Sequence, residues 1–267
     1  MRPAFNGEPG KDWYLAEGTY VFAGVPGDCL GEVTLVNCSD EKVRIRRLET
    51  RPPPRKRKGR RTLEGANLQF SVRMRPGEIL RTEAHFQVPP GTAPGEYDAL
   101  VTCGDRKVRV EATVFEHAAL AVSPGHIRIQ GHSGDAVSVP ITITNEGNVP
   151  VALRDVGMVW LRERDWIGRT LVYALRETQE SDSYEDFANR LLHDFRRAIV
   201  SPARIQLTPM IDDPLAVGQC LTRTLDLTLP QGLQKGRLYM GFIKINETRI
   251  WLELYCNGRS ISSNKRG

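Results

Sequence analysis

The chain has 267 residues, of which 40% are hydrophobic and 26% are charged, a balance that is typical of a globular protein and excludes wholesale disorder. No run approaches the roughly 20 apolar residues of a membrane-spanning helix, and the five cysteines lack the paired spacing of a zinc site or a disulfide framework. The net charge of +5 depends on one basic loop, without which the remainder is slightly acidic.

The first ten residues lack the unbroken apolar core of a secretory signal. We therefore expect a cytoplasmic protein, or an extracellular one if an export signal has been removed. Cys38 and Cys103 are expected near the ends of two strands at one pole of the first module. Reduced thiols are the simpler expectation, whereas a bridge between them would indicate export.

Two halves of the chain carry the same turn motifs in the same order, which is the signature of a duplicated module. The matching pairs are 27–29 with 134–136, 33–37 with 141–145, and 88–95 with 229–236. We predict two domains, residues 1–117 and 118–258, followed by a flexible tail at 259–267. Almost no linker separates the two domains.

The first module shows the alternation of apolar and polar residues that half-buried antiparallel strands require. Val108, Val110 and Ala112, for example, alternate with charged neighbours. Strands are expected at 19–22, 30–36, 42–48, 68–74, 80–88, 97–103 and 107–115. Seven short strands with turns rich in glycine and proline predict a β-sandwich.

The second module repeats this plan and is longer between the matching landmarks. After an opening run at 119–122, strands are expected at 127–129, 136–144, 151–161, 220–229, 238–245 and 249–255. Apolar residues at helical spacing within the extra segment predict an amphipathic helix over about 183–200. Asp182 or Ser183 is suited to cap its start.

The segment from Val139 to Val151, with its Asn145-Glu146-Gly147-Asn148 turn, resembles the prokaryotic immunoglobulin-like modules of the CARDB and NEW3 type. The segment from Val88 to Tyr97 is similar to the part of those modules that enters strand F. The resemblance implies an all-β fold of two tandem immunoglobulin-like β-sandwiches, the second with a helical insertion. Modules of this kind are mostly adhesive, spacing or assembly units.

A basic loop at 51–61 is stiffened by three prolines and carries seven basic residues without an acidic one. Such a loop suits the phosphates of nucleic acid or of anionic lipid, although it lacks the aromatic residues that read single strands. A solvated or protein-docking loop is the competing interpretation. The candidate anion-binding residues are Arg55, Lys56, Arg57, Lys58, Arg60 and Arg61.

The insertion offers a candidate protein-binding surface, because tryptophans with nearby arginines are typical of interfaces. Trp166 is either a partner contact or an anchor of the insertion, and the helix either closes its own sandwich or docks a partner. Trp251 is expected in the core. The candidate partner-binding residues are Trp160, Trp166, Tyr184, Phe187, Leu191 and Phe195.

Catalysis finds little support, because the five histidines are scattered and no nucleophile, metal or phosphate-loop motif is present. His132-Ser133-Gly134-Asp135 reads as a turn rather than as a catalytic triad. We expect no enzyme and no cofactor, but a structural or protein-interaction subunit of a larger prokaryotic assembly. The alternatives are a nucleic-acid-associated module that uses the basic loop and an extracellular adhesion or carbohydrate-associated module. The sequence leaves the partner and the oligomeric state open.

Overall fold

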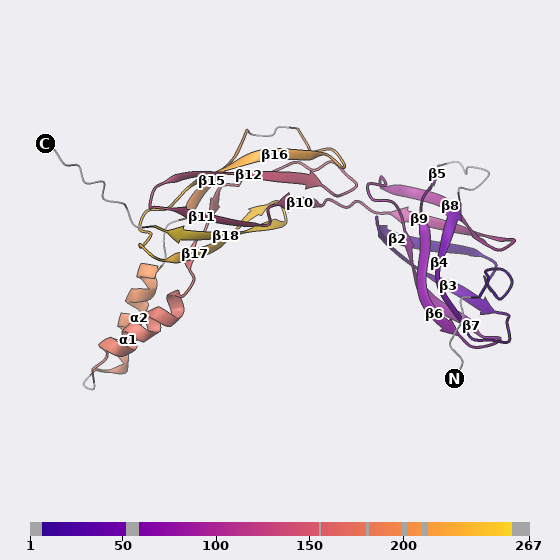
Figure 1. Cartoon of the computed structure of the whole chain (residues 1–267), viewed down its shortest axis with the longest axis horizontal. Coiled ribbons are helices and arrows are strands. Elements are labelled where there is room, and N and C mark those ends of the chain that lie inside the picture. The colour runs from indigo at the N-terminus through magenta and orange to yellow at the C-terminus, as the bar shows by residue number, and fades with distance from the viewer. Residues whose placement is uncertain are drawn as a thin grey trace. The chain divides into compact units, whose positions relative to one another are not determined.

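The computed structural model of the chain describes residues 7–51, 59–154, 156–179, 182–198, 202–209 and 213–257. It is mostly β-structure, with two helices, and it separates into two compact units (Figure 1). Unit 1 comprises Met1–Ala119 with Glu146–Val151 and Ala216–Gly218. Unit 2 comprises Leu120–Asn145, Ala152–Leu215 and Gln219–Gly267.

The strands of unit 1 form one sheet in the order β1-β3-β2-β9-β8-β4-β6-β7, and β5 pairs with β8. Because β3 also pairs with β7, the sheet closes on itself as a barrel of seven strands. The strands are β1 (Trp13–Leu15), β2 (Thr19–Val25), β3 (Asp28–Asn37), β4 (Val43–Arg51), β5 (Arg61–Thr62), β6 (Asn67–Met74), β7 (Ile79–Gln87), β8 (Gly95–Cys103) and β9 (Arg106–Val114).

The closed sheet corrects the expectation of an open two-sheet sandwich for unit 1. All seven expected strands are present, but β3 pairs along both of its edges, so that Gly31 is opposite Phe22 on β2 and Ala84 on β7. A Cβ atom at Gly31 would lie 2.4 Å from the carbonyl oxygen of Val21. Glycine at this position therefore lets β2 approach β3 closely while the other edge of β3 pairs with β7.

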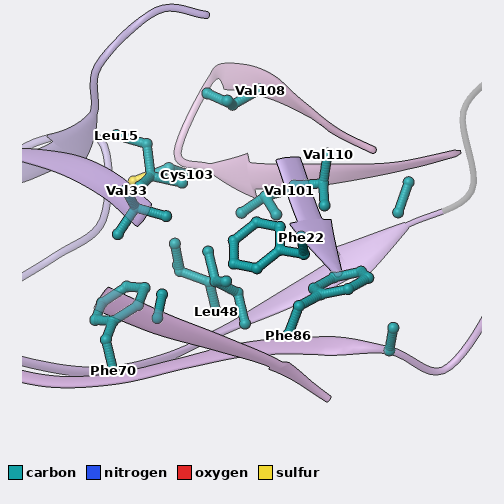
Figure 2. Close-up of a cluster of buried hydrophobic side chains, with 14 of the residues drawn as sticks. Leu15, Phe22, Val33, Leu48, Phe70, Phe86, Val101, Cys103, Val108 and Val110 are labelled. Atoms are coloured by element: carbon teal, nitrogen blue, oxygen red, sulfur yellow. The ribbon is translucent and has the colours of Figure 1, made fainter. Parts of the chain in front are cut away.

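The interior of unit 1 is filled by the apolar residues that alternate along its strands (Figure 2). Phe22 and Phe86 are both fully buried, and their ring centroids lie 5.3 Å apart. Cys103 is also buried, and burial raises the pKa of its thiol. All five cysteines are free thiols, so Cys38 and Cys103 are not bridged.

The strands of unit 2 form two sheets that share one hydrophobic core. One sheet has the order β10-β12-β16-β15-β13 and the other the order β11-β18-β17-β14. The elements are β10 (Leu120–Ser123), β11 (His126–Gly131), β12 (Ala136–Asn145), β13 (Met158–Val159), β14 (Arg162–Glu163), α1 (Trp166–Glu177), α2 (Tyr184–Ala198), β15 (Ala203–Thr208), β16 (Cys220–Thr228), β17 (Leu238–Ile245) and β18 (Thr248–Cys256).

The strand expected at 151–161 is wrong in its extent, because only Met158–Val159 of its described residues form a strand, and the next strand, Arg162–Glu163, begins beyond it. In the residues that precede β13, the side chain of Asn246 forms hydrogen bonds with the backbone at positions where a neighbouring strand would otherwise pair. Its Nδ2 donates to the carbonyl of Ala152 at 2.9 Å, and its Oδ1 accepts from the amide of Arg154 at 3.1 Å. This bond pattern holds the segment as an irregular connection.

Replacing the buried ring of Phe86 is expected to destabilise unit 1. Phe86→Ala removes the partner of Phe22 and leaves a cavity, at a cost of about 3–5 kcal/mol. The matched control is Phe115→Ala, because Phe115 is half exposed and should change the stability by less than about 1 kcal/mol. Urea unfolding of the full chain, followed by hydrogen exchange on peptides from each unit, measures both. Equal effects of the two changes would contradict the assigned core.

Candidate functional site

The outer face of the four-stranded sheet of unit 2 carries large apolar side chains that no helix or strand of the described residues covers. Inward residues of β18 alternate with outward ones, and Trp251 on β18 is opposite Phe242 on β17. Their ring centroids lie 6.3 Å apart in an edge-to-face arrangement. Trp251 is 53% exposed, so the expectation that it belongs to the core is wrong. Strand alternation explains this, because the core positions are its neighbours Ile250 and Leu252.

A third aromatic side chain reaches this face from the connection between β13 and β14. A Cβ atom at Gly241 would lie 2.7 Å from the carbonyl oxygen of Trp160 and 3.1 Å from Leu161. The missing side chain of Gly241 therefore lets this connection cross β17 closely. Trp160 is 64% exposed and lies beside Phe242 and Trp251 in the lining of one groove.

The groove has a volume of about 630 Å³. We call it the aromatic groove and define it by its lining residues, which are Trp160, Leu161, Arg162, Glu163, Arg164, Trp166, Met240, Gly241, Phe242 and Trp251. Sequence reasoning found Trp160 and Trp166 but missed Met240 and Phe242. The alternation of β17 was the available signal, because it puts these two residues on the face opposite Tyr239 and Ile243.

The charged residues of the groove have two different environments. Glu163 is buried and forms ion pairs with Arg169 of α1 and, at 3.5 Å, with Arg237. Burial, together with the charge of Arg237, lowers the pKa of Arg169. By contrast, Arg162 and Arg164 are exposed, and neither forms an ion pair with the carboxylates in the described part of the chain. The groove therefore has a cationic rim beside its apolar lining.

The insertion of unit 2 is a helical hairpin in which α1 packs against α2. Figure 1 shows the two helices side by side and extending away from the sheets of unit 2. Trp166 of α1 and Phe195 of α2 stack edge to face with centroids 5.1 Å apart. Thr170 and Ala174 are the buried residues of α1. Neither helix contributes to the hydrophobic core between the sheets.

The predicted apolar stripe of the second helix is mostly used inside the hairpin. Phe187, Leu191 and Phe195 are partly buried, whereas Tyr184 is 85% exposed and lies against Phe187 with centroids 6.5 Å apart. Trp166 acts both as an anchor of α1 on α2 and as a wall of the aromatic groove. The sequence did not indicate α1, which supplies the packing surface for this stripe.

Ser183 caps α2 through a reciprocal pair of bonds with Asp186. The amide of Asp186 donates to Ser183 Oγ at 3.2 Å, and the amide of Ser183 donates to Asp186 Oδ2 at 3.0 Å. The bonds from Ser183 lower the pKa of Asp186. Asp182 instead accepts from the amide of Gln179 and from Arg190, which lower its pKa. The start of the helix is therefore fixed by side-chain bonds.

A second exposed apolar set lies on α1, at positions that recur every four residues. Ile167, Leu171 and Leu175 are all exposed, and we call them the α1 stripe. Residues separated by four positions share one face of a helix, so the three side chains form a continuous apolar ridge. None of these three residues is among the buried positions of α1, which are Thr170 and Ala174.

The basic loop is described only at its two ends, at Arg51 and at residues 59–61. Arg55, Lys56, Arg57 and Lys58 lie outside the described residues. Arg60 forms ion pairs with Glu96 and Asp98, both at 3.2 Å, and with Glu111 at 2.6 Å, so protein carboxylates already occupy its donors. These bonds raise the pKa of Arg60, and the bond with Asp98 has the largest effect. We therefore leave Arg60 out of any phosphate-binding set, whereas Arg61 is exposed at the start of β5.

The described residues hold neither a metal-type cluster nor a helix that could span a membrane. No group of three or more histidine, cysteine, aspartate or glutamate side chains in these residues is arranged to hold a metal ion. Neither α1 nor α2 has the length and apolar content that crossing a membrane requires.

Comparisons with known proteins give fold-level likenesses of low quality. No protein-family model matches the chain, and no curated protein matches its sequence. A solved protein of unknown function from Porphyromonas gingivalis W83 is 12% identical, with 92% of this chain and 100% of that one covered and a TM-score of 0.26. The titin domains z1z2, solved in complex with telethonin, are 14% identical, with 95% of each chain covered and a TM-score of 0.24. Domains 4 and 5 of the S-layer protein SbsC are 12% identical, with 79% and 98% covered and a TM-score of 0.24. We draw no functional argument from likenesses this weak.

Adding a methyl group at Gly241 is expected to displace Trp160 from the groove. Gly241→Ala brings a Cβ atom against the carbonyl of Trp160, so the connection must shift, at a cost of about 1–3 kcal/mol to unit 2. Gly157→Ala is the control, because a Cβ atom there meets nothing within 4 Å. Tryptophan fluorescence and urea unfolding of the full chain measure the change. Indistinguishable results for the two variants would contradict the close crossing.

Proposed function

We propose that the chain is a non-catalytic, structural protein-interaction subunit that associates through the helical hairpin of unit 2. The observation that carries this proposal is the α1 stripe, an apolar ridge on a helix that extends away from the sheets. Each of its three aliphatic side chains gains about 1.5–3 kcal/mol when it is fully buried. A surface of this kind favours association with another apolar helix.

The partner that suits the stripe is the same helix of a second copy of the chain. The stripe is symmetric about Leu171, so two antiparallel copies place Ile167 opposite Leu175 of the other copy and Leu171 opposite itself. Two hairpins paired in this way complete a four-helix bundle with two-fold symmetry.

In this proposal the segment His132-Ser133-Gly134-Asp135 is a structural turn. The hydroxyl of Ser133 donates to the carbonyl of Leu233 at 3.3 Å. Asp135 Oδ2 accepts from the amide of His132 at 2.7 Å and lies 3.0 Å from His132 Nδ1, and these contacts close the turn.

Placing a charge in the α1 stripe is expected to abolish self-association. The full chain should be a dimer at micromolar concentrations by analytical ultracentrifugation, and Leu171→Glu should be a monomer, because burying an unpaired carboxylate opposes the contact. Ile79→Glu is the matched control, since Ile79 is an exposed aliphatic residue of unit 1. Circular dichroism verifies that each variant is folded.

Two results would overturn this proposal. One is a wild-type chain that stays monomeric over the whole concentration range. The other is a dimer that both Leu171→Glu and the milder Leu171→Ala leave intact, which would place the contact elsewhere. A heterologous helix that binds the monomeric wild-type chain and is lost in Leu171→Glu would reject the second copy as the partner.

A further inference from the structure

A second surface, separate from the α1 stripe, lies on the outer face of the β17–β18 sheet. Its floor is built in two rows by strand pairing. In one row Met240 lies opposite Arg162 on one side and Glu253 on the other, and in the next row Phe242 lies opposite Trp251. Trp160 stands beside these rows because Gly241 lets its connection approach. The aromatic groove is therefore held by backbone pairing and is formed before any ligand arrives.

The charges around this floor favour an anion. Exposed Arg162 and Arg164 line the groove, and the guanidinium of Arg249 lies 5.2 Å from the ring centroid of Phe242. Two carboxylates of this face, Glu163 and Glu253, are already paired. Glu163 is bound by two arginines, and Glu253 is bound by Arg128 at 2.9 Å and His126 at 3.4 Å. An incoming carboxylate would thus meet guanidinium groups that lack a carboxylate partner among the described residues.

The arrangement of the aromatic rings selects the shape of the ligand. The planes of Phe242 and Trp251 are inclined by 68°, so they do not form one flat platform. The successive bases of a single strand stack one after another on aromatic faces, whereas these two inclined rings offer no common face. An angle between two rings instead accepts one bulky apolar side chain, and the adjacent Met240 adapts to its shape.

From the charge and the ring geometry together, we infer that the aromatic groove binds an acidic peptide segment through one bulky apolar side chain. That side chain inserts among Trp160, Phe242 and Trp251, while flanking carboxylates pair with Arg162 and Arg164. Arginine and carboxylate form charge-assisted bonds of fixed geometry, so the rim orients the peptide along the groove. This site goes beyond the self-association proposed above and does not require it.

The probes are three synthetic peptides, studied by isothermal titration calorimetry with the full chain. The first carries glutamates around one central phenylalanine, the second replaces the glutamates by lysines, and the third replaces the phenylalanine by serine. The first peptide should bind at least about tenfold more tightly than either of the others, and its affinity should fall as salt rises. Leu171→Glu should bind it as the wild type does.

Two variants separate the apolar and the charged contributions. Trp160→Ala should weaken the phenylalanine peptide about tenfold, because an exposed ring is removed without disturbing the core. The double change Arg162→Glu and Arg164→Glu should reverse the preference toward the lysine peptide. Arg204→Glu is the control on the other sheet of unit 2, and it should have no effect.

Several outcomes would overturn the inference. Equal affinity for the three peptides, or no binding of the acidic one, removes the proposed ligand. Binding that Trp160→Ala and the double arginine change leave intact moves the ligand to another surface. A thymidine oligonucleotide or an alginate oligosaccharide that binds more tightly than the peptide, and responds to the same variants, would assign the groove to nucleic acid or to anionic carbohydrate.

Discussion

The position of the helical hairpin depends on one buried carboxylate. Glu163 lies on β14, where it is paired in register with Tyr239 of β17, and its side chain binds Arg169 of α1 and Arg237 at the start of β17. A buried carboxylate that loses its partners costs about 3–5 kcal/mol, so the first turns of α1 must stay against this edge of the sheet. Trp166 is thereby placed at the groove, and the remainder of the hairpin extends from a fixed base.

Strand alternation made most of unit 1 predictable, but it did not reveal how the sheet closes. Every expected strand is present, because period-two burial is a local property of the sequence. Closure rests on the pairing of β3 with β7, which joins Cys29 to Phe86 across a long stretch of chain. No local pattern encodes such a contact. The one available sign was Gly31, a glycine inside an alternating strand.

The candidate site of unit 2 was predictable only in part, for reasons that differ between its elements. α2 has a polar face and a reciprocal Ser183–Asp186 cap, so its periodicity is clear. α1 also has apolar residues at helical spacing, Ile167, Leu171, Ala174 and Leu175, but Asp165 makes no side-chain cap bond, so its start lacks the fixed cap that marks α2. The aromatic groove requires Gly241, whose effect on Trp160 appears only when the connection is seen in space.

The two apolar surfaces of unit 2 are joined through Trp166. Its ring packs on Phe195 within the hairpin and also forms part of the groove lining, so the hairpin contributes a wall to a site that otherwise belongs to the sheet. The α1 stripe is exposed and adjoins the buried positions Thr170 and Ala174 of the same helix, whereas the Trp166 ring itself packs on α2. Loosening the α1–α2 contact, by contrast, alters both the ridge and the groove wall. The insertion thus serves as a structural part of the groove as well as a surface of its own.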